Sequence, residues 1–319
     1  MTLLSPHHGA DHASEIYPAA VKIFEGVIRR VRISNGRDTG PSALPHWSPI
    51  ASYTAHLVST LAPIFELPDG GVIERAAAAV ICFDYFCRAI DRMTDENDST
   101  IEGIHEATLV LLEGVGLATS LSHRSERLLA KIRSYFAEAS AGERFLWRHK
   151  GDQCAFGDID FKMMGQKNAV MKSAAAALAS ASGKWDLLER LEPVIHDLSV
   201  CIQLIDDLID WENDLKAGYY SHVVNRALAT ASSTEVEQLR EALIFRGVAA
   251  EIINLALEHF NRAFQALFRI GLSENLPGLS EAGQSLIAAQ ALLRSASGTP
   301  AEIELILQQV FHPVLNYGH

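Results

Sequence analysis

Apolar residues recur every three to four positions through almost the whole chain, which is the spacing of one face of an α-helix. Alternating apolar and polar runs, which indicate strands, are absent, and so are Asn-Gly hairpin turns between such runs. The pattern therefore predicts an all-α protein. The predicted helices cover residues 17–33, 47–66, 71–95, 101–120, 123–139, 142–164, 166–182, 185–215, 221–230, 233–246, 249–270, 279–296 and 301–311.

The breaks between these helices are short turns rich in Gly and Pro, and none of them resembles a linker between domains. Two segments, AAAAVICFDYFCRAI and SAAAALASAS, are apolar around most of a helical circumference, which is typical of central members of a bundle. We expect one all-α domain over residues 17–319 after a disordered segment, residues 1–16. The longest irregular stretch, residues 34–49, is expected to form a mobile loop near a cavity mouth.

Composition narrows the classes of function. The hydrophobic and charged fractions, 48% and 21%, are those of a globular protein, and a net charge of −12 argues against a nucleic-acid partner. No basic leader with a long apolar core and no membrane-spanning run is visible, so a cytoplasmic protein is expected. The cysteines lack CxxC spacing, which argues against a structural zinc site or a disulfide framework. They are Cys82, Cys87, Cys154 and Cys201.

An acidic stripe follows an apolar run in QLIDDLIDWENDLKAGYYS, which spans residues 203–221. Asp206, Asp210 and Asp214 are four residues apart, so a helix would carry all three on one face. Like charges at this spacing repel, and partial burial adds a desolvation cost. A divalent cation would remove both penalties, and carboxylates suit Mg²⁺ or Mn²⁺. Taken alone, the stripe is better explained as a solvated helix face.

A second acidic helix end changes that interpretation. In FDYFCRAIDRMTDENDST, Asp91 and Asp95 are again four residues apart and are followed by Glu96 and Asp98. Two helices of this kind can face each other across one cavity and bridge cations between opposite walls. We therefore expect a metal and phosphate site built from both.

These two motifs resemble those of the class I isoprenoid synthases, which include trans-prenyltransferases, squalene and phytoene synthases, and terpene cyclases. The resemblance covers residues 72–221 and implies a helical fold around a central active-site cavity, a prenyl diphosphate substrate and a homodimer. It implies three Mg²⁺ ions, two held by Asp91 and Asp95 and the third by Asp206, Asp210 and Asp214.

The same resemblance suggests which other side chains contact the substrate. Lys167, in QKNAVMK, falls where trans-prenyltransferases keep a lysine before the second motif, so it is the strongest candidate for a diphosphate contact. Asp91, Asp95, Asp206, Asp210 and Lys167 form the expected catalytic set. Weaker candidates for the diphosphate are Lys162, Lys172, Arg88, Arg92 and Lys216, and those for the cavity wall are Phe83, Cys87 and Gln203. Phe83 suits a protein core equally well. Asp84 either orients Arg88 or acts as a base on a carbocation.

Departures from the family patterns separate its subclasses. The stretch ENDSTIEGIHEA lacks the Arg-Arg pair with which chain-elongating prenyltransferases bind a second diphosphate, and Arg92 replaces the usual second Asp of the first motif. The second motif has Ile209-Asp210 where squalene and phytoene synthases have Arg-Asp. The triad also lacks the Asn and Ser of bacterial terpene cyclases, and no Arg-Tyr pair is visible near the C-terminus.

The leading hypothesis from the sequence is a class I terpene synthase, a lyase that ionises farnesyl or geranylgeranyl diphosphate with Mg²⁺ and releases pyrophosphate. The alternative is a prenyltransferase, acting by chain elongation, by head-to-head coupling or on a non-isoprenoid acceptor. Two further classes remain open. A ferritin-like dimetal oxidase needs two Glu-x-x-His elements and only Glu102 to His105 fits. A helical binding protein without catalysis would keep its ligand binding after loss of Asp206 and Asp210.

Overall fold

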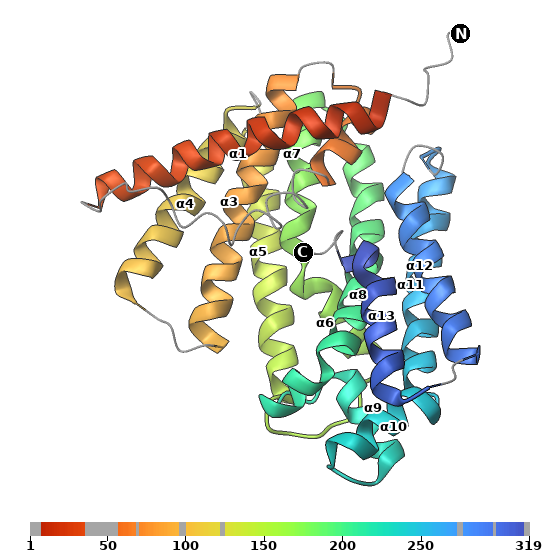
Figure 1. Cartoon of the computed structure of the whole chain (residues 1–319). Coiled ribbons are helices and arrows are strands. Elements are labelled where there is room, and N and C mark those ends of the chain that lie inside the picture. The colour runs from red at the N-terminus through yellow and green to blue at the C-terminus, as the bar shows by residue number, and fades with distance from the viewer. Residues whose placement is uncertain are drawn as a thin grey trace. The chain divides into compact units, whose positions relative to one another are not determined.

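The computed structural model describes residues 8–35, 57–67, 70–95, 100–121, 125–272, 277–295 and 298–315. For residues 8–16, 91–95, 277–279, 281 and 312–315 it describes the helical backbone but not the side chains. Within these ranges the regular elements are helices and none is a strand (Figure 1). One isolated bridge joins Lys150 and Tyr219. The predicted all-α class is confirmed.

The described helices follow the apolar periodicity closely. The α-helices are α1 (His8–Ser34), α3 (Gly70–Asp95), α4 (Ile101–Thr119), α5 (Ser125–Leu146), α6 (Asp158–Lys167), α7 (Lys172–Ser182), α8 (Trp185–Lys216), α9 (His222–Ala231), α10 (Val236–Phe245), α11 (Val248–Arg269), α12 (Pro277–Ser295) and α13 (Pro300–Leu315). Short 3-10 turns add η2 (Ala62–Phe65), η3 (Trp147–His149) and η4 (Ala169–Met171).

Local signals place several of the helix ends. The side chain of Thr100 accepts a hydrogen bond from the Gly103 amide and caps α4, and Ser221 caps α9 in the same way through the Val224 amide. α7 ends at Gly183, whose φ of 78° lies in the left-handed region that glycine adopts without strain.

The chain divides into two compact units that alternate along the sequence. Of the described residues, the first contains those up to 136 and residues 170–190, and the second contains residues 137–169 and those from 191 onward. Helices α5 and α8 each contribute residues to both.

The first unit is built around α3, which packs against α1, α4 and α7 (Figure 1). The alanines at 76–79 of α3 and at 174–177 of α7 are at most 1% exposed, so both apolar helices predicted to be central are buried. Small side chains let helix backbones approach closely. At Gly114 of α4 a Cβ would lie 2.6 Å from the Cβ of Cys82, so this crossing excludes even alanine without a shift.

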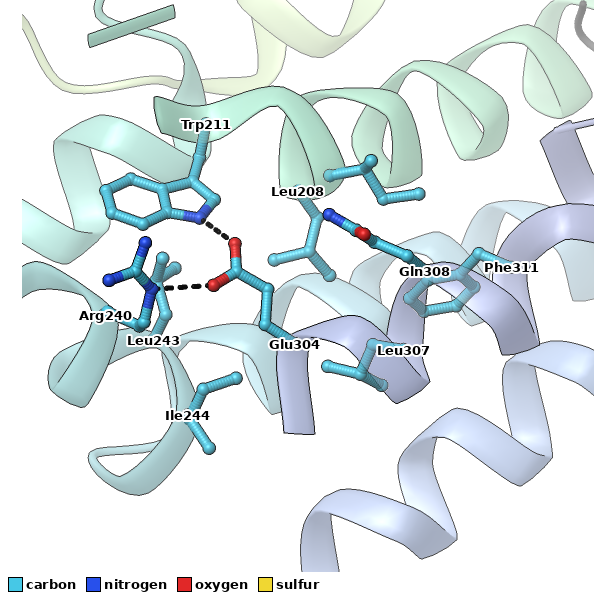
Figure 2. A pocket seen from close by; sticks show the side chains of 10 residues that line it. Leu208, Trp211, Arg240, Leu243, Ile244, Glu304, Leu307, Gln308 and Phe311 are labelled. Carbon is cyan, nitrogen blue, oxygen red and sulfur yellow. Dashed lines mark hydrogen bonds and ion pairs between the residues drawn. The ribbon is translucent and has the colours of Figure 1, made fainter. Parts of the chain in front are cut away.

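The second unit has its core between the later part of α8 and helices α9 to α13. Leu204, Ile205 and Trp211 of α8 are at most 1% exposed. Figure 2 shows how the polar atoms here are satisfied. The indole Nε1 of Trp211 donates to Glu304 Oε1 at 2.8 Å, and Arg240 Nε donates to Glu304 Oε2 at 2.8 Å.

We expect Glu304→Ala to lower the free energy of unfolding by about 2 kcal/mol, because the buried Trp211 N–H and the Arg240 guanidinium would lose their acceptor. Urea unfolding followed by circular dichroism measures the change. Glu237→Ala is the matched control, since Glu237 also pairs with Arg240 but its side chain is 80% exposed. A control loss above about 0.5 kcal/mol would show that Arg240, and not the buried acceptor, dominates.

Three helix boundaries differ from the sequence prediction. α1 begins at His8, ahead of the expected start at residue 17 and within the segment expected to be disordered. The predicted helix over 142–164 is wrong, because α5 runs to Leu146 and the backbone is not helical from residue 150 to 157. Gly151 has a φ of 84°, which a helix cannot accommodate, and the Asp160 carboxylate accepts the Gly157 amide and starts α6 afresh. The helix expected over 166–182 is interrupted at Asn168. Residues 36–49 of the loop expected over 34–49 lie outside the described residues.

Candidate functional site

The acidic stripe lies on α8, within the second unit. Asp206 and Asp214 are half-buried, Asp210 is exposed, and the neighbouring Asp207 is only 4% exposed. The stripe is therefore half-buried at both ends and exposed in the middle, with a buried acid beside it, and it is not a wholly solvated helix face. The deepest carboxylate belongs to Asp207, which the four-residue spacing does not single out.

Gln203 lies one helical turn before the stripe, and its side chain contacts the carboxylates of Asp206 and Asp207. Its Nε2 donates to Asp207 Oδ1 at 2.8 Å and lies 3.3 Å from Asp206 Oδ2. The other carboxylate oxygen of Asp207 is buried and has no hydrogen-bond partner. Burial, and then the charge of Asp214, raise the pKa of Asp207 well above its usual range. Gln203 was expected at the cavity wall, and here its contact is with the acids.

Asp214 also has one buried carboxylate oxygen without a hydrogen-bond partner. Burial raises its pKa to about 7, a hydrogen bond from the Ser221 side chain opposes this, and the charges of Asp210 and Asp206 add to it. Ser221 therefore serves two purposes, since it also caps α9. The acids repel one another, and Asp207 and Asp214 each keep one buried oxygen without a donor, which is the electrostatic setting in which a cation is stabilising.

Lys167 ends α6 and lies close enough to the stripe for its charge to lower the pKa of both Asp207 and Asp214. Its Nζ is 3.6 Å from Glu143 Oε2 on α5. Gly142 makes this approach possible, because a Cβ there would lie 2.6 Å from the Met163 carbonyl oxygen and 2.7 Å from the Lys167 amide nitrogen. Lys167 thus reaches the acids through a close contact between the backbones of α5 and α6.

The first acidic motif lies at the end of α3, in the first unit. The helix continues through Asp91 to Asp95, but the side chains of residues 91–95 are not described. Glu96 and Asp98 lie outside the described residues altogether. The two halves of the expected site therefore belong to different units, and the joint coordination of cations by Asp91, Asp95 and the α8 acids stays a prediction.

The remaining predicted residues have varied surroundings. Arg88 Nε forms an ion pair with Asp84 Oδ2 at 3.3 Å, the arrangement in which Asp84 orients Arg88. Phe83 is fully buried and packs edge to face on Phe136, with ring centroids 6.0 Å apart, as a core residue of the first unit would. Cys87 is half-buried.

The other candidate lysines differ in their surroundings. Lys162 is exposed, and Lys172 is buried beside Tyr135. Lys216 forms an ion pair with Glu212 at 2.9 Å.

In the part of the chain with described side chains, no three His, Cys, Asp or Glu side chains converge closely enough to hold a metal by themselves. The acids of α8 would need water or phosphate oxygens to complete a coordination shell, which is the usual situation for Mg²⁺. The sequence patterns did not single out Gly142 or Ser221. A serine just after Gly218 at the end of α8 signals a helix cap, whereas the role of Gly142 depends on tertiary packing and has no signal in the sequence.

Comparison with known proteins bears on the fold. No protein-family model matches the sequence, and no match was found among curated proteins. Among solved structures, a decaprenyl diphosphate synthase from Rhodobacter capsulatus matches with a TM-score of 0.66 and 14% identity, over 87% of this chain and 99% of that one. A geranylgeranyl pyrophosphate synthetase from the archaeon Geoglobus acetivorans matches with a TM-score of 0.66 and 17% identity, over 87% and 98%.

This chain has the isoprenoid synthase fold. A polyprenyl synthase from Caulobacter crescentus, solved with calcium and isoprenyl diphosphate, also matches, with a TM-score of 0.58 and 14% identity over 81% of this chain and 91% of that one. The expected resemblance is therefore confirmed at the level of the isoprenoid synthase fold. The described helices include none that is both long and apolar enough to cross a membrane.

Proposed function

We propose that this protein is a metal-dependent prenyltransferase that ionises an allylic prenyl diphosphate and transfers the prenyl group to an acceptor. The observation that carries the proposal is the acidic face of α8, where two carboxylate oxygens are buried without a hydrogen-bond partner, in a chain with the isoprenoid synthase fold. The two solved structures that match with a TM-score of 0.66 are a decaprenyl diphosphate synthase and a geranylgeranyl pyrophosphate synthetase. They favour transfer over the terpene synthase reaction that the sequence alone put first.

The α8 residues fit a divalent cation. Two of their carboxylate oxygens, Asp207 Oδ2 and Asp214 Oδ2, are buried without a hydrogen-bond partner. We assign Asp206, Asp210 and Asp214 as the residues that would hold Mg²⁺ on this wall, with Asp91 and Asp95 as their counterparts on α3. When bound, the cation would neutralise the negative charge that develops on the departing diphosphate.

Three further side chains of the second unit would support this chemistry. Gln203 orients the carboxylates of Asp206 and Asp207, and Ser221 orients that of Asp214. Lys167 supplies a cationic donor close to these acids, where a diphosphate would need one. Fixed charges of this kind stabilise a leaving group without reorganising during the reaction.

A terpene synthase remains the second candidate because of one sequence feature. The stretch after Asp95, ENDSTIEGIHEA, has no Arg-Arg pair for a second diphosphate. An acceptor without a diphosphate would fit the prenyltransferase proposal as well, whereas a reaction with no acceptor would favour the synthase.

The deciding experiment incubates the protein with geranyl, farnesyl and geranylgeranyl diphosphate, singly and each with isopentenyl diphosphate or a second prenyl diphosphate, and measures pyrophosphate and organic products. We expect Mg²⁺-dependent release that requires an acceptor and stops on addition of EDTA. Release from a single diphosphate with a cyclic or rearranged product would establish the terpene synthase. Intact substrates under every condition, with folded protein and a panel extended to aromatic acceptors, would overturn both.

Lys167→Ala is expected to lower kcat/KM for pyrophosphate release by about 10-fold, because the diphosphate loses one cationic donor. Lys22→Ala is the matched control, since Lys22 is exposed on α1 and is not among the diphosphate candidates. Steady-state kinetics with the best substrate pair measures both variants. Equal losses in the two variants would remove Lys167 from the site.

A further inference from the structure

A second chemical cluster lies in the second unit, in the loop between α5 and α6. His149 is 0% exposed, and its two ring nitrogens contact different partners. Nε2 lies 2.8 Å from Asp160 Oδ1, and Nδ1 lies 2.9 Å from the Sγ of Cys154. Cysteine, histidine and aspartate are therefore hydrogen-bonded in series, in the order that general-base activation of a thiol requires.

Asp160 determines how the protons are arranged. Its Oδ2 accepts the Gly157 amide at 2.8 Å, and its Oδ1 accepts from Arg148 as well as from His149. Burial raises the pKa of Asp160, but the hydrogen bonds from Gly157, His149 and Arg148 outweigh it and hold the pKa below its usual value. The carboxylate is thus ionised, and it draws the imidazole proton onto Nε2. The contact from Arg148 Nε to the same nitrogen is longer, at 3.5 Å. Nδ1 is left as the acceptor that faces the thiol.

Aromatic rings help to exclude water from the His149 imidazole. Phe156 stacks on His149 with ring centroids 4.1 Å apart, and Phe156 and Phe161 both pack on His222. Burial lowers the pKa of His222 to about 4, so that ring stays neutral and adds no competing charge. Cys154 itself is half-buried in a loop whose residues 151–153 are exposed. The cysteine therefore lies in a partly exposed loop, where a small reagent can reach it.

Two of the other cysteines are deeply buried instead. Burial raises the pKa of Cys82 far above its usual value and that of Cys201 to about 12, which leaves both thiols inert. Cys87 is half-buried like Cys154, so it is the internal comparison for exposure.

We propose that Cys154 is a covalent modification site, a nucleophilic thiol activated by His149 and Asp160, for soft carbon electrophiles. With an alkyl halide the Sγ–C bond forms as the carbon–halogen bond breaks, the halide leaves with the bonding pair, and the thiol proton passes to His149 Nδ1. Asp160 stabilises the resulting imidazolium. The site is separate from the acids of α8 and does not depend on the proposed prenyl transfer.

The test is a time course of iodoacetamide alkylation at pH 7, with each cysteine followed by peptide mass spectrometry. We expect Cys154 to react at least about 10-fold faster than Cys87, and His149→Gln to remove that advantage. His222→Gln is the matched control, because it changes a neighbouring buried ring in the same aromatic group, and it should leave the Cys154 rate within about threefold. Equal rates for Cys154 and Cys87, or an unchanged rate in folded His149→Gln, would overturn the proposal.

A second measurement uses the unaltered chain, so its result does not depend on whether the His149→Gln variant folds. Burial alone slows alkylation of a thiol, so a merely structural cysteine reacts more slowly in the native protein than in urea. We expect the opposite order for Cys154, with native alkylation faster than alkylation in urea. Slower native alkylation of Cys154, as expected for Cys82 and Cys201, would show that the Cys–His–Asp series is structural.

Discussion

Asp206→Asn is expected to lower kcat/KM for pyrophosphate release about 100- to 1,000-fold while the protein stays folded. The amide keeps the shape of the carboxylate and can still accept from Gln203, but it removes one negative charge from the face proposed to hold Mg²⁺. The same change relieves repulsion within the acidic stripe, so the unfolding midpoint should stay constant or rise. Loss of activity without loss of stability would indicate that the Asp206 charge contributes to function and not to folding.

Asp186→Asn is the matched control, since it makes the same chemical change at the start of α8. Its side chain is 80% exposed and pairs with Arg190 at 3.1 Å, an ion pair worth less than about 1 kcal/mol. Kinetics at saturating Mg²⁺ and thermal unfolding should be measured on both variants. If Asp206→Asn keeps activity within threefold of the unaltered protein, the α8 acids are not the cation site.

Gly142→Ala is expected to lower the free energy of unfolding by about 3 kcal/mol, the upper range for overpacking a buried contact. The added Cβ would meet the Met163 carbonyl and the Lys167 amide, and these backbone atoms cannot rotate away as a flexible side chain can. The variant should also lose activity, because α6 must shift and carry Lys167 with it. Urea unfolding and kinetics on the same sample separate the two effects.

Gly116→Ala tests whether the contact, and not the loss of glycine, is responsible. Gly116 lies in α4, and a Cβ there would meet nothing within 4 Å. This substitution should stabilise by about 0.5 to 1 kcal/mol, since alanine has the higher helix propensity. An equal and destabilising effect at both glycines would contradict the packing argument.

The sequence predicted the helical class because apolar periodicity is a local property, and nearly every described helix follows it. It failed between residues 147 and 157 for a physical reason. Phe145, Leu146, Phe156 and Phe161 keep apolar residues at spacings that suit a helix, and all of them pack on the core of the second unit. The break depends on the positive φ of Gly151 and on the Asp160 cap, and neither is visible as a period.

The sequence predicted which acids of α8 share one face of the helix, but not how deeply each carboxylate is buried. Four-residue spacing alone puts Asp206, Asp210 and Asp214 on one face. Which carboxylate lies deepest depends on how α8 packs within its unit, and the answer, Asp207, falls between the predicted positions. The Cys154, His149 and Asp160 series was missed for a similar reason. Its members are separated by five and by six residues across a loop, a spacing that follows no regular element.

The alternation of the two units along the sequence has a consequence for synthesis on the ribosome. The apolar face of α3 is covered in part by α7, whose residues, 172–182, are made long after α3 has emerged. During that interval residues 137–169, which belong to the other unit, are already outside the tunnel. Neither unit can therefore be completed before the other has begun, and the part of α3 that packs against α7 gains this partner only after residues 137–169 of the other unit have been made.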